Sequence, residues 1–205
     1  MLRVLDSAKS VDEPVLVHLL GVPGAGKSTV AALLARELSP LSPTLVAFDQ
    51  LMEAVPEYRR ATDRQEAFRR WELPARDAGY ALLRELIQAR ATVVLDHSGA
   101  GPGHVELLEY ARTALHYRTA VVRLRTSPET AARRAAARQA TNGRYLPAHY
   151  IAERQVVIER LLEGYRRAAD DYVEIANDEE CDTALRPLAT ACARFAQRFT
   201  GPGPA

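Results

Sequence analysis

Eight residues near the N-terminus, Gly21 to Ser28, constrain this chain more than any other stretch. They read Gly-Val-Pro-Gly-Ala-Gly-Lys-Ser and lie between the apolar run Pro14 to Leu20 and a helical run that extends to Leu38. The spacing is that of the phosphate-binding P-loop, in which glycines let backbone N–H groups approach phosphate oxygens. The helix N-terminus adds partial positive charge at the same point. A strand that enters and a helix that leaves are the context that this pattern requires.

Each polar position in this loop has an expected role. Lys27 reaches the β- and γ-phosphates of a nucleotide, and the Ser28 hydroxyl binds Mg²⁺. Lys9 is the only other lysine among 27 basic residues, so Lys27 stands out against an arginine-rich background. The alternative is a glycine-rich turn with a chance lysine. We expect ATP and Mg²⁺ as cofactors, bound by Gly21, Val22, Pro23, Gly24, Ala25, Gly26, Lys27, Ser28 and Thr29.

Short β-type runs alternate with helical segments along the rest of the chain, which predicts an α/β fold. Such alternation is typical of a parallel sheet with helices on both faces. The helical stretch from Thr62 to Arg90 is expected to break near Pro74, because proline cannot continue the backbone hydrogen bonds. The five expected strands are Pro14 to Leu20, Pro43 to Phe48, Thr92 to Leu95, Thr119 to Leu124 and Tyr172 to Ala176.

Length and charge set further limits. A chain of 205 residues fits one domain, expected over residues 1–200 and followed by a flexible tail at 201–205. The net charge of +1 predicts no general attraction to nucleic acid or to an anionic membrane. The first 13 residues lack an apolar run, and no stretch approaches the length needed to cross a bilayer. We therefore expect a cytoplasmic protein without a membrane partner.

Two aspartates directly follow expected strands. In an open parallel sheet, ligands bind beyond the C-terminal strand ends, so Asp49 and Asp96 should face the same site. Asp96 resembles the carboxylate that holds magnesium in P-loop enzymes, and Asp49 is placed to accept a proton from a hydroxyl group. The two roles could be exchanged, and either residue could instead be a helix cap or a turn aspartate.

An arginine-rich segment follows the fourth strand. Arg134 and Arg138 are four residues apart and share one helix face, and Arg144 follows the turn Asn142-Gly143. Arginine keeps its charge and binds phosphate through two N–H groups, as a lid that closes on a transferring phosphate requires. We expect this lid over about residues 127–147. The alternative is a solvent-exposed basic face, and the sequence does not decide which of Arg133, Arg134, Arg138 and Arg144 touches phosphate.

These motifs together resemble the small P-loop kinases that include zeta toxins and the polynucleotide kinase domain. The resemblance rests on Gly-Val-Pro-Gly-Ala-Gly-Lys-Ser-Thr, on Asp49, on the arginine pair and on Gly-Arg-Tyr-Leu-Pro at 143–147. Phe48-Asp49-Gln50 followed by Val55-Pro56-Glu57-Tyr58 is most similar to the zeta toxin branch. Gluconate kinases and chloramphenicol phosphotransferases are more distant relatives.

The resemblance implies a five-stranded sheet of order 2-3-1-4-5 and assigns roles to single residues. It makes Asp49 the base that accepts the acceptor proton and Arg138 the lid arginine, with Arg134 and Arg144 less firmly placed. It also brings Asn177 beside the adenine base, where a turn asparagine is the other interpretation. Zeta toxins carry an acidic residue after the third strand, which Asp96 matches, whereas His97-Ser98-Gly99 departs from their pattern.

Two histidines lie near this expected site. His97 follows Asp96 and contacts either the acceptor or the protein interior, and His18 within the first strand is expected to be a hydrogen-bonded core residue. The leading hypothesis is an ATP-dependent kinase that transfers the γ-phosphate to a hydroxyl of a small molecule or nucleotide. A polynucleotide 5′-hydroxyl kinase is the alternative within this class, and a nucleotide-binding switch or NTPase is the alternative outside it. An antitoxin partner is possible, and the oligomeric state stays open.

Overall fold

The sheet has five parallel strands in the order β2-β3-β1-β4-β5, which confirms the expected topology. The computed structural model describes residues 8–147, 149–178 and 181–200, so the expected tail at 201–205 lies outside the described residues. The strands are β1 Val15–Leu20, β2 Thr44–Ala47, β3 Val93–Asp96, β4 Arg118–Arg125 and β5 Asp171–Ala176.

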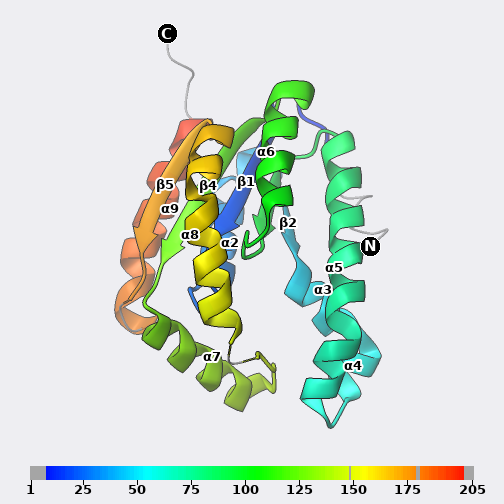
Figure 1. Ribbon diagram of the computed structural model, residues 1–205. Coiled ribbons are helices and arrows are strands. Elements are labelled where there is room, and N and C mark those ends of the chain that lie inside the picture. Colours follow the sequence, from blue (N-terminus) through cyan, green and yellow to red (C-terminus); the bar gives the residue numbers. More distant parts are fainter. Residues whose placement is uncertain (1–7, 148, 179–180, 201–205) are drawn as a thin grey trace.

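Helices cover both faces of this sheet (Figure 1). One face carries α2 (Lys27–Glu37) and α9 (Cys181–Thr200), which pack against each other, and the 3-10 turn η1 (Ser39–Leu41) follows α2. The other face carries α6 (Pro102–Leu115) and α8 (Tyr150–Ala168). Strand β1 is buried along its whole length, which explains its almost continuous apolar sequence. Of the helices that the structure describes, none has a stretch both long and apolar enough for a membrane span.

Helix α5 runs unbroken from Arg64 to Gln88 with Pro74 inside it, so the expected break near Pro74 is wrong. Buried residues lie both before the proline, at Phe68, and after it, at Ala75 and Leu82. Packing along this one face holds the helix together despite the missing backbone hydrogen bond, since tertiary contacts override local preference.

Two short helices follow β2 where the sequence analysis expected only a strand end. Strand β2 ends at Ala47, and α3 (Phe48–Ala54) begins at the next residue, followed by α4 (Pro56–Arg60). The side chain of Phe48 packs against the backbone of Gly79 in α5, where an added Cβ would lie 2.3 Å from the ring. This close approach anchors α3 on α5 and fixes the direction in which α3 leaves the sheet.

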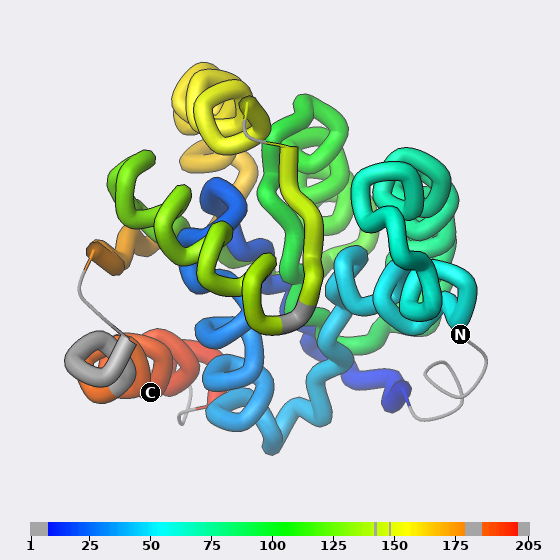
Figure 2. The backbone as a smooth tube through the Cα atoms, turned by 90° about the horizontal axis from the view of Figure 1, so that it is seen from below, coloured from blue at the N-terminus to red at the C-terminus, as the bar shows by residue number. Residues whose placement is uncertain are grey.

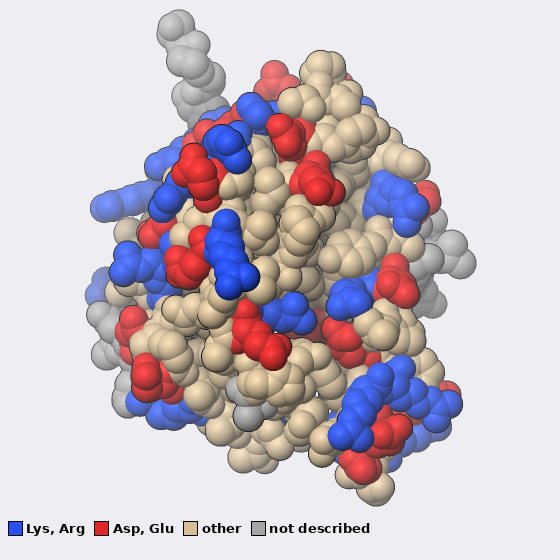
Figure 3. All heavy atoms as spheres, viewed as in Figure 1, with Lys and Arg blue, Asp and Glu red and all other residues tan. Residues whose placement is uncertain are grey.

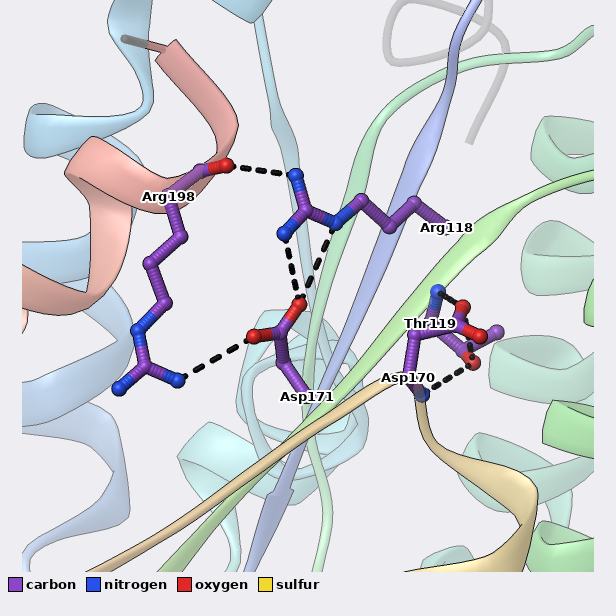
Figure 4. A network of polar contacts seen from close by, with 5 residues as sticks. All are labelled: Arg118, Thr119, Asp170, Asp171 and Arg198. Carbon is purple, nitrogen blue, oxygen red and sulfur yellow. Dashed lines mark hydrogen bonds and ion pairs between the residues drawn. The ribbon is translucent and has the colours of Figure 1, made fainter. Parts of the chain in front are cut away.

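The N-terminal ends of β4 and β5 are joined by a network of polar contacts (Figure 4). Arg118 donates to Asp171 through Nε and Nη2, at 3.2 and 2.9 Å, and Arg198 of α9 donates to the other carboxylate oxygen at 3.2 Å. Beside them, the backbone N–H of Thr119 donates to the Asp170 carboxylate at 2.8 Å. This network ties the β4–β5 edge to α9 at the end of the sheet opposite the C-terminal strand ends.

Helix α7 (Pro128–Asn142) and the segment after it cross the C-terminal ends of the strands, with α3 and α4 beside them (Figure 2). The Ser127 side chain caps the helix by accepting from the backbone N–H of Thr130. The helix ends at Gly143, whose φ of 69° is the left-handed conformation that glycine tolerates. The chain therefore turns back toward α3 at this glycine.

Candidate functional site

A cavity of about 550 Å³ lies at the C-terminal ends of the strands, between the phosphate loop, α3 and α7. This is the edge where parallel sheets bind their ligands. Its wall contains most of the polar side chains that the sequence analysis selected, together with several that it did not. Among the lining residues are Pro23, Gly24, Gly26, Lys27, Ser28, Thr29, Asp49, Glu53, Asp96, His97, Arg134, Arg138, Arg144, Tyr145, Tyr150 and Arg154.

The loop between β1 and α2 has the backbone that phosphate binding requires. Gly24 and Gly26 take φ values of 85° and 91°, which side chains rarely adopt. An added Cβ would lie 2.2 Å from the Ala131 carbonyl at Gly24, and 2.4 Å from the Asn177 amide nitrogen at Gly26. Both glycines are thus required by conformation and by space. Gly21, Val22 and Ala25 do not line this cavity, and the last two are buried in the core.

Asn177 anchors the phosphate loop by a hydrogen bond from the end of β5. Its side-chain amide donates to the Ala25 carbonyl at 2.8 Å, and the residue is almost completely buried. The backbone carbonyl of Asn177 accepts from the Thr126 hydroxyl at 3.2 Å and from the Arg134 guanidinium at 2.9 Å. These contacts link the end of β5 to the phosphate loop and to α7. A contact of Asn177 with the nucleotide base stays a prediction.

Lys27 is partly buried at the N-terminus of α2, and its ammonium group donates to the Val22 carbonyl at 3.0 Å. Burial lowers the pKa of the amine to about 8, Asp96 acts in the opposite direction, and Arg144 and Arg138 lower it further. A partly buried ammonium close to two guanidinium groups favours an anion in the cavity, because a negative charge offsets the cost of desolvation.

Asp49 lies in the first turn of α3 and not directly after a strand, which corrects its expected local context. Its carboxylate still faces the cavity, with 64% of the side chain exposed, and forms an ion pair with Arg144. Arg144 also contacts Glu53 at 3.2 Å, and burial lowers the pKa of this guanidinium to about 10. Asp49 and Glu53 thus hold the Arg144 guanidinium in the cavity wall.

The other arginines of the segment differ in position. Arg134 and Arg138 both line the cavity, whereas Arg133 is exposed on α7 and does not. Arg134 contacts the Asn177 carbonyl, and burial lowers the pKa of Arg138, opposed by Glu53 and Asp96. Within the described residues, the buried Nε of Arg138 has no hydrogen-bond partner.

Asp96 and His97 both line the cavity at the end of β3. The His97 ring packs against Phe48 and stacks on His104, with ring centroids 4.9 and 4.4 Å apart. Burial lowers the pKa of His97 well below its usual range, so the ring is neutral. His97 therefore forms part of the cavity wall and also belongs to the interior, and its contact with an acceptor stays a prediction.

Three charged cavity residues escaped the sequence analysis, namely Glu53, Glu72 and Arg154. Glu53 follows Asp49 by four residues, so both carboxylates lie on one face of α3. This spacing would have indicated the pair if α3 had been recognised. Arg154 reaches the cavity from α8, where its guanidinium lies 5.1 Å from the Tyr150 ring centroid. No sequence motif marks Arg154, because only the packing of α8 on the sheet places it there.

Comparison with known proteins places this geometry in context. A family model described as an AAA domain matches residues 16–161, and no curated protein matches the chain. A structure from the PezAT chromosomal toxin–antitoxin system of Streptococcus pneumoniae is similar, with 14% identity and a TM-score of 0.64. That alignment covers 96% of this chain and 90% of the other.

Two further solved structures share the fold. A putative kinase from Chloroflexus aurantiacus has 17% identity and a TM-score of 0.59, over 87% of this chain and 98% of its own. Shikimate kinase from Acinetobacter baumannii, in complex with shikimate, has 21% identity and a TM-score of 0.52, over 93% and 97%. At these identities the comparison establishes a shared P-loop kinase-like fold.

Proposed function

Since the chain belongs to the AAA domain family, we propose that it is an ATP- and Mg²⁺-dependent phosphotransferase that acts on a hydroxyl group. The observation that carries this proposal is the set of residues that line one cavity. A phosphate loop with its lysine, four arginines and an accessible carboxylate line the same space of about 550 Å³. Phosphoryl transfer depends mainly on such positioning and on charge stabilisation.

On the nucleotide side, Lys27, Arg138 and Arg134 bind the triphosphate of ATP, with backbone N–H groups of residues 21–29 around it. Ser28 and Asp96 both line the cavity and offer the oxygen ligands that Mg²⁺ prefers, so this pair fits the ion. When bound, Mg²⁺ neutralises charge on the phosphates.

On the acceptor side, Asp49 accepts the proton of the attacking hydroxyl group. The acceptor oxygen forms a bond to the γ-phosphorus, the bond from this phosphorus to the ADP oxygen breaks, and the proton passes to the carboxylate. Arg144 moves from its ion pair with Asp49 toward the γ-phosphate as the nucleotide binds, so that the carboxylate becomes free when phosphate is present. The segment 127–147 acts as the lid.

The acceptor is a small molecule or a nucleotide-type compound in this proposal. Acidic and basic side chains are interspersed over the face drawn in Figure 3, without one continuous basic stripe there. A polynucleotide 5′-hydroxyl kinase needs such a stripe, because affinity for nucleic acid rests on phosphate contacts. A zeta toxin-like role, with an antitoxin partner, is supported by the similarity in fold to the pneumococcal structure. It predicts growth arrest on expression that Lys27→Ala abolishes.

The test is a γ-phosphate transfer screen with the purified protein. The acceptors are nucleotide sugars, nucleosides, sugars, 5′-hydroxyl oligonucleotides and hydroxylated small molecules. We expect a labelled product whose formation falls roughly 10²–10⁴-fold in Asp49→Asn, with ATP affinity much less affected. Asp77→Asn, an exposed aspartate on α5 away from the cavity, is the matched control. ATP hydrolysis without any labelled acceptor, unchanged in Asp49→Asn, would instead identify a nucleotide switch or NTPase.

A further inference from the structure

Three histidines from separate parts of the fold converge beneath the acceptor end of the cavity. His18 lies in β1, His97 follows β3, and His104 lies in the first turns of α6. One ring nitrogen from each lies within 4.8 Å of the other two. The Nε2 atom of His18 is 3.1 Å from Nδ1 of His104, and the rings of His97 and His104 are stacked.

The environment keeps all three rings in the form that binds metals. His18 and His104 are buried, and His97 is partly covered by Phe48. Burial lowers the pKa of His104 to about 4 and shifts His18 and His97 in the same direction. A neutral imidazole has a free lone pair, which is what a transition-metal ion requires.

Hydrogen bonding within the cluster is incomplete without a further partner. Tyr80 Oη lies 2.9 Å from Nε2 of His104, and Nδ1 of His104 faces His18. Nδ1 of His18 is buried and has no hydrogen-bond partner among the described residues. An ion bound through Nε2 of His18 would replace the contact with His104 and would leave Nδ1 unsatisfied, so the case for the ion rests on the convergence of the three rings.

We propose that His18, His97 and His104 bind a divalent transition-metal ion, with Zn²⁺ as the ion that suits a set of three imidazoles. Three histidines with water in the fourth position form a familiar tetrahedral zinc site. Nε2–H of His104 then donates to Tyr80, which leaves Nδ1 as the ligand atom and fixes the ring from its outer side. Nitrogen ligands separate this site from the oxygen ligands of the proposed Mg²⁺ site.

Metal binding requires the His97 ring to turn, because it is stacked on His104 and its Nδ1 accepts from the backbone N–H of Gly99 at 3.3 Å. Nitrogens about 2.1 Å from a tetrahedral ion lie about 3.4 Å apart, so a separation of 4.8 Å must close by about 1.4 Å. The pair formed by His18 and His104 is already closer than that. Because β1 and α6 hold these two residues, the adjustment falls on His97, which follows the end of its strand. The ion would join β1, β3 and α6 and would fix the position of His97 in the cavity wall.

The first experiment is a titration of the protein with Co²⁺, a spectroscopic substitute for Zn²⁺. The protein is prepared without a histidine tag, treated with a chelator, and held in excess Mg²⁺ without nucleotide. We expect one equivalent of Co²⁺ to produce visible absorption bands typical of tetrahedral nitrogen ligands, and Zn²⁺ to displace it. Zn²⁺ should also raise Tm by roughly 5 °C, because it binds only the folded chain. Absence of both effects overturns the proposal.

Two substitutions and a control then assign the ligands. His97→Gln, at the cavity wall, and His104→Gln should each weaken Co²⁺ binding at least about 100-fold, beyond the effect of an outer contact. His116→Asn is the matched control, because His116 is exposed and has a positive φ that asparagine tolerates. Unchanged binding in folded His97→Gln overturns the assignment, even if His104→Gln does not fold. The measurement uses no ATP, so its failure leaves the proposed phosphotransfer untouched.

Discussion

The phosphate loop at 21–29 and the arginine segment at 134–144 face the same cavity but are built in different ways. The loop is a continuous stretch whose backbone takes its shape from Gly24 and Gly26. The arginines reach the cavity from a helix and from the segment after it. Distant partners, the Asn177 carbonyl and the carboxylates of α3, hold Arg134 and Arg144 in place.

The phosphate loop is therefore preformed, whereas the position of Arg144 depends on whether phosphate is bound. The loop is fixed by covalent neighbours and by packing against Ala131, so a ligand has little to rearrange there. Arg144 is held by Asp49 and Glu53, which compete with phosphate for the same guanidinium. We therefore expect substitutions in the loop to weaken both nucleotide binding and phosphoryl transfer. Substitutions in the arginine segment should act mainly on phosphoryl transfer.

The largest effect is expected for Lys27→Ala. Loss of the Lys27 ammonium group removes charge stabilisation from the transferring group. Transfer should fall by about 10³-fold or more in a steady-state assay with saturating ATP. Lys9→Ala, at the other lysine, which is exposed, should have no effect. Equal activity of the two variants would remove the loop from the mechanism.

The next effect separates the arginines from one another. Arg144→Gln and Arg138→Gln should each lower kcat by about 10²-fold, because each guanidinium lines the cavity where charge develops. Arg133→Gln, on the exposed side of α7, is the matched control and should leave kcat unchanged. A loss of ATP affinity as large as the loss of kcat in Arg144→Gln would contradict its proposed action during transfer.

A pH effect should distinguish the lysine from the arginines. Burial lowers the pKa of Lys27 from 10.5 to about 8, so in the free protein the amine loses its charge as pH rises through about 8. ATP affinity should then fall by up to about tenfold per pH unit above that point. Calorimetric titration between pH 7 and 10 measures this decline.

Lys27→Arg supplies the control for this effect, since arginine stays charged over the whole range. A decline of the same steepness in that variant would assign the effect to another group. The free energy of unfolding without ATP should change in the opposite sense. Below pH 8 the folded protein carries the full cost of keeping Lys27 charged in a desolvated position. As pH rises from 8 toward 10.5 this cost is relieved, so the free energy of unfolding increases.

The smallest effect is expected where the two regions are joined. Asn177→Ala removes the hydrogen bond to Ala25 and should lower the free energy of unfolding by about 1–3 kcal/mol, measured by urea denaturation. ATP affinity should fall only a few fold, because the loop keeps its glycines. Gln139→Ala, at an exposed amide on α7, should change stability by less than about 0.5 kcal/mol. A larger loss of ATP affinity than of stability would favour direct contact with the nucleotide.

The sequence by itself determined the fold class, the strand order through a family resemblance, and the phosphate loop. These features depend on local conformation or on apolar runs, so residues 21–28 and β1 could be identified from neighbouring residues alone. The strands were located to within about one or two residues, which is the usual uncertainty at element ends. The continuous course of α5 through Pro74 could not be predicted, because packing on both sides of the proline overrides its local effect.

Tertiary structure alone decided which charges meet. The pairing of Arg144 with Asp49 and Glu53 joins residues about 90 positions apart, and Arg154 enters the cavity through the packing of α8. The convergence of His18, His97 and His104 likewise depends on the register of β1 with β3 and on the position of α6. Side chains far apart in the chain are brought together by helices docking on a sheet, and no short sequence pattern records that geometry.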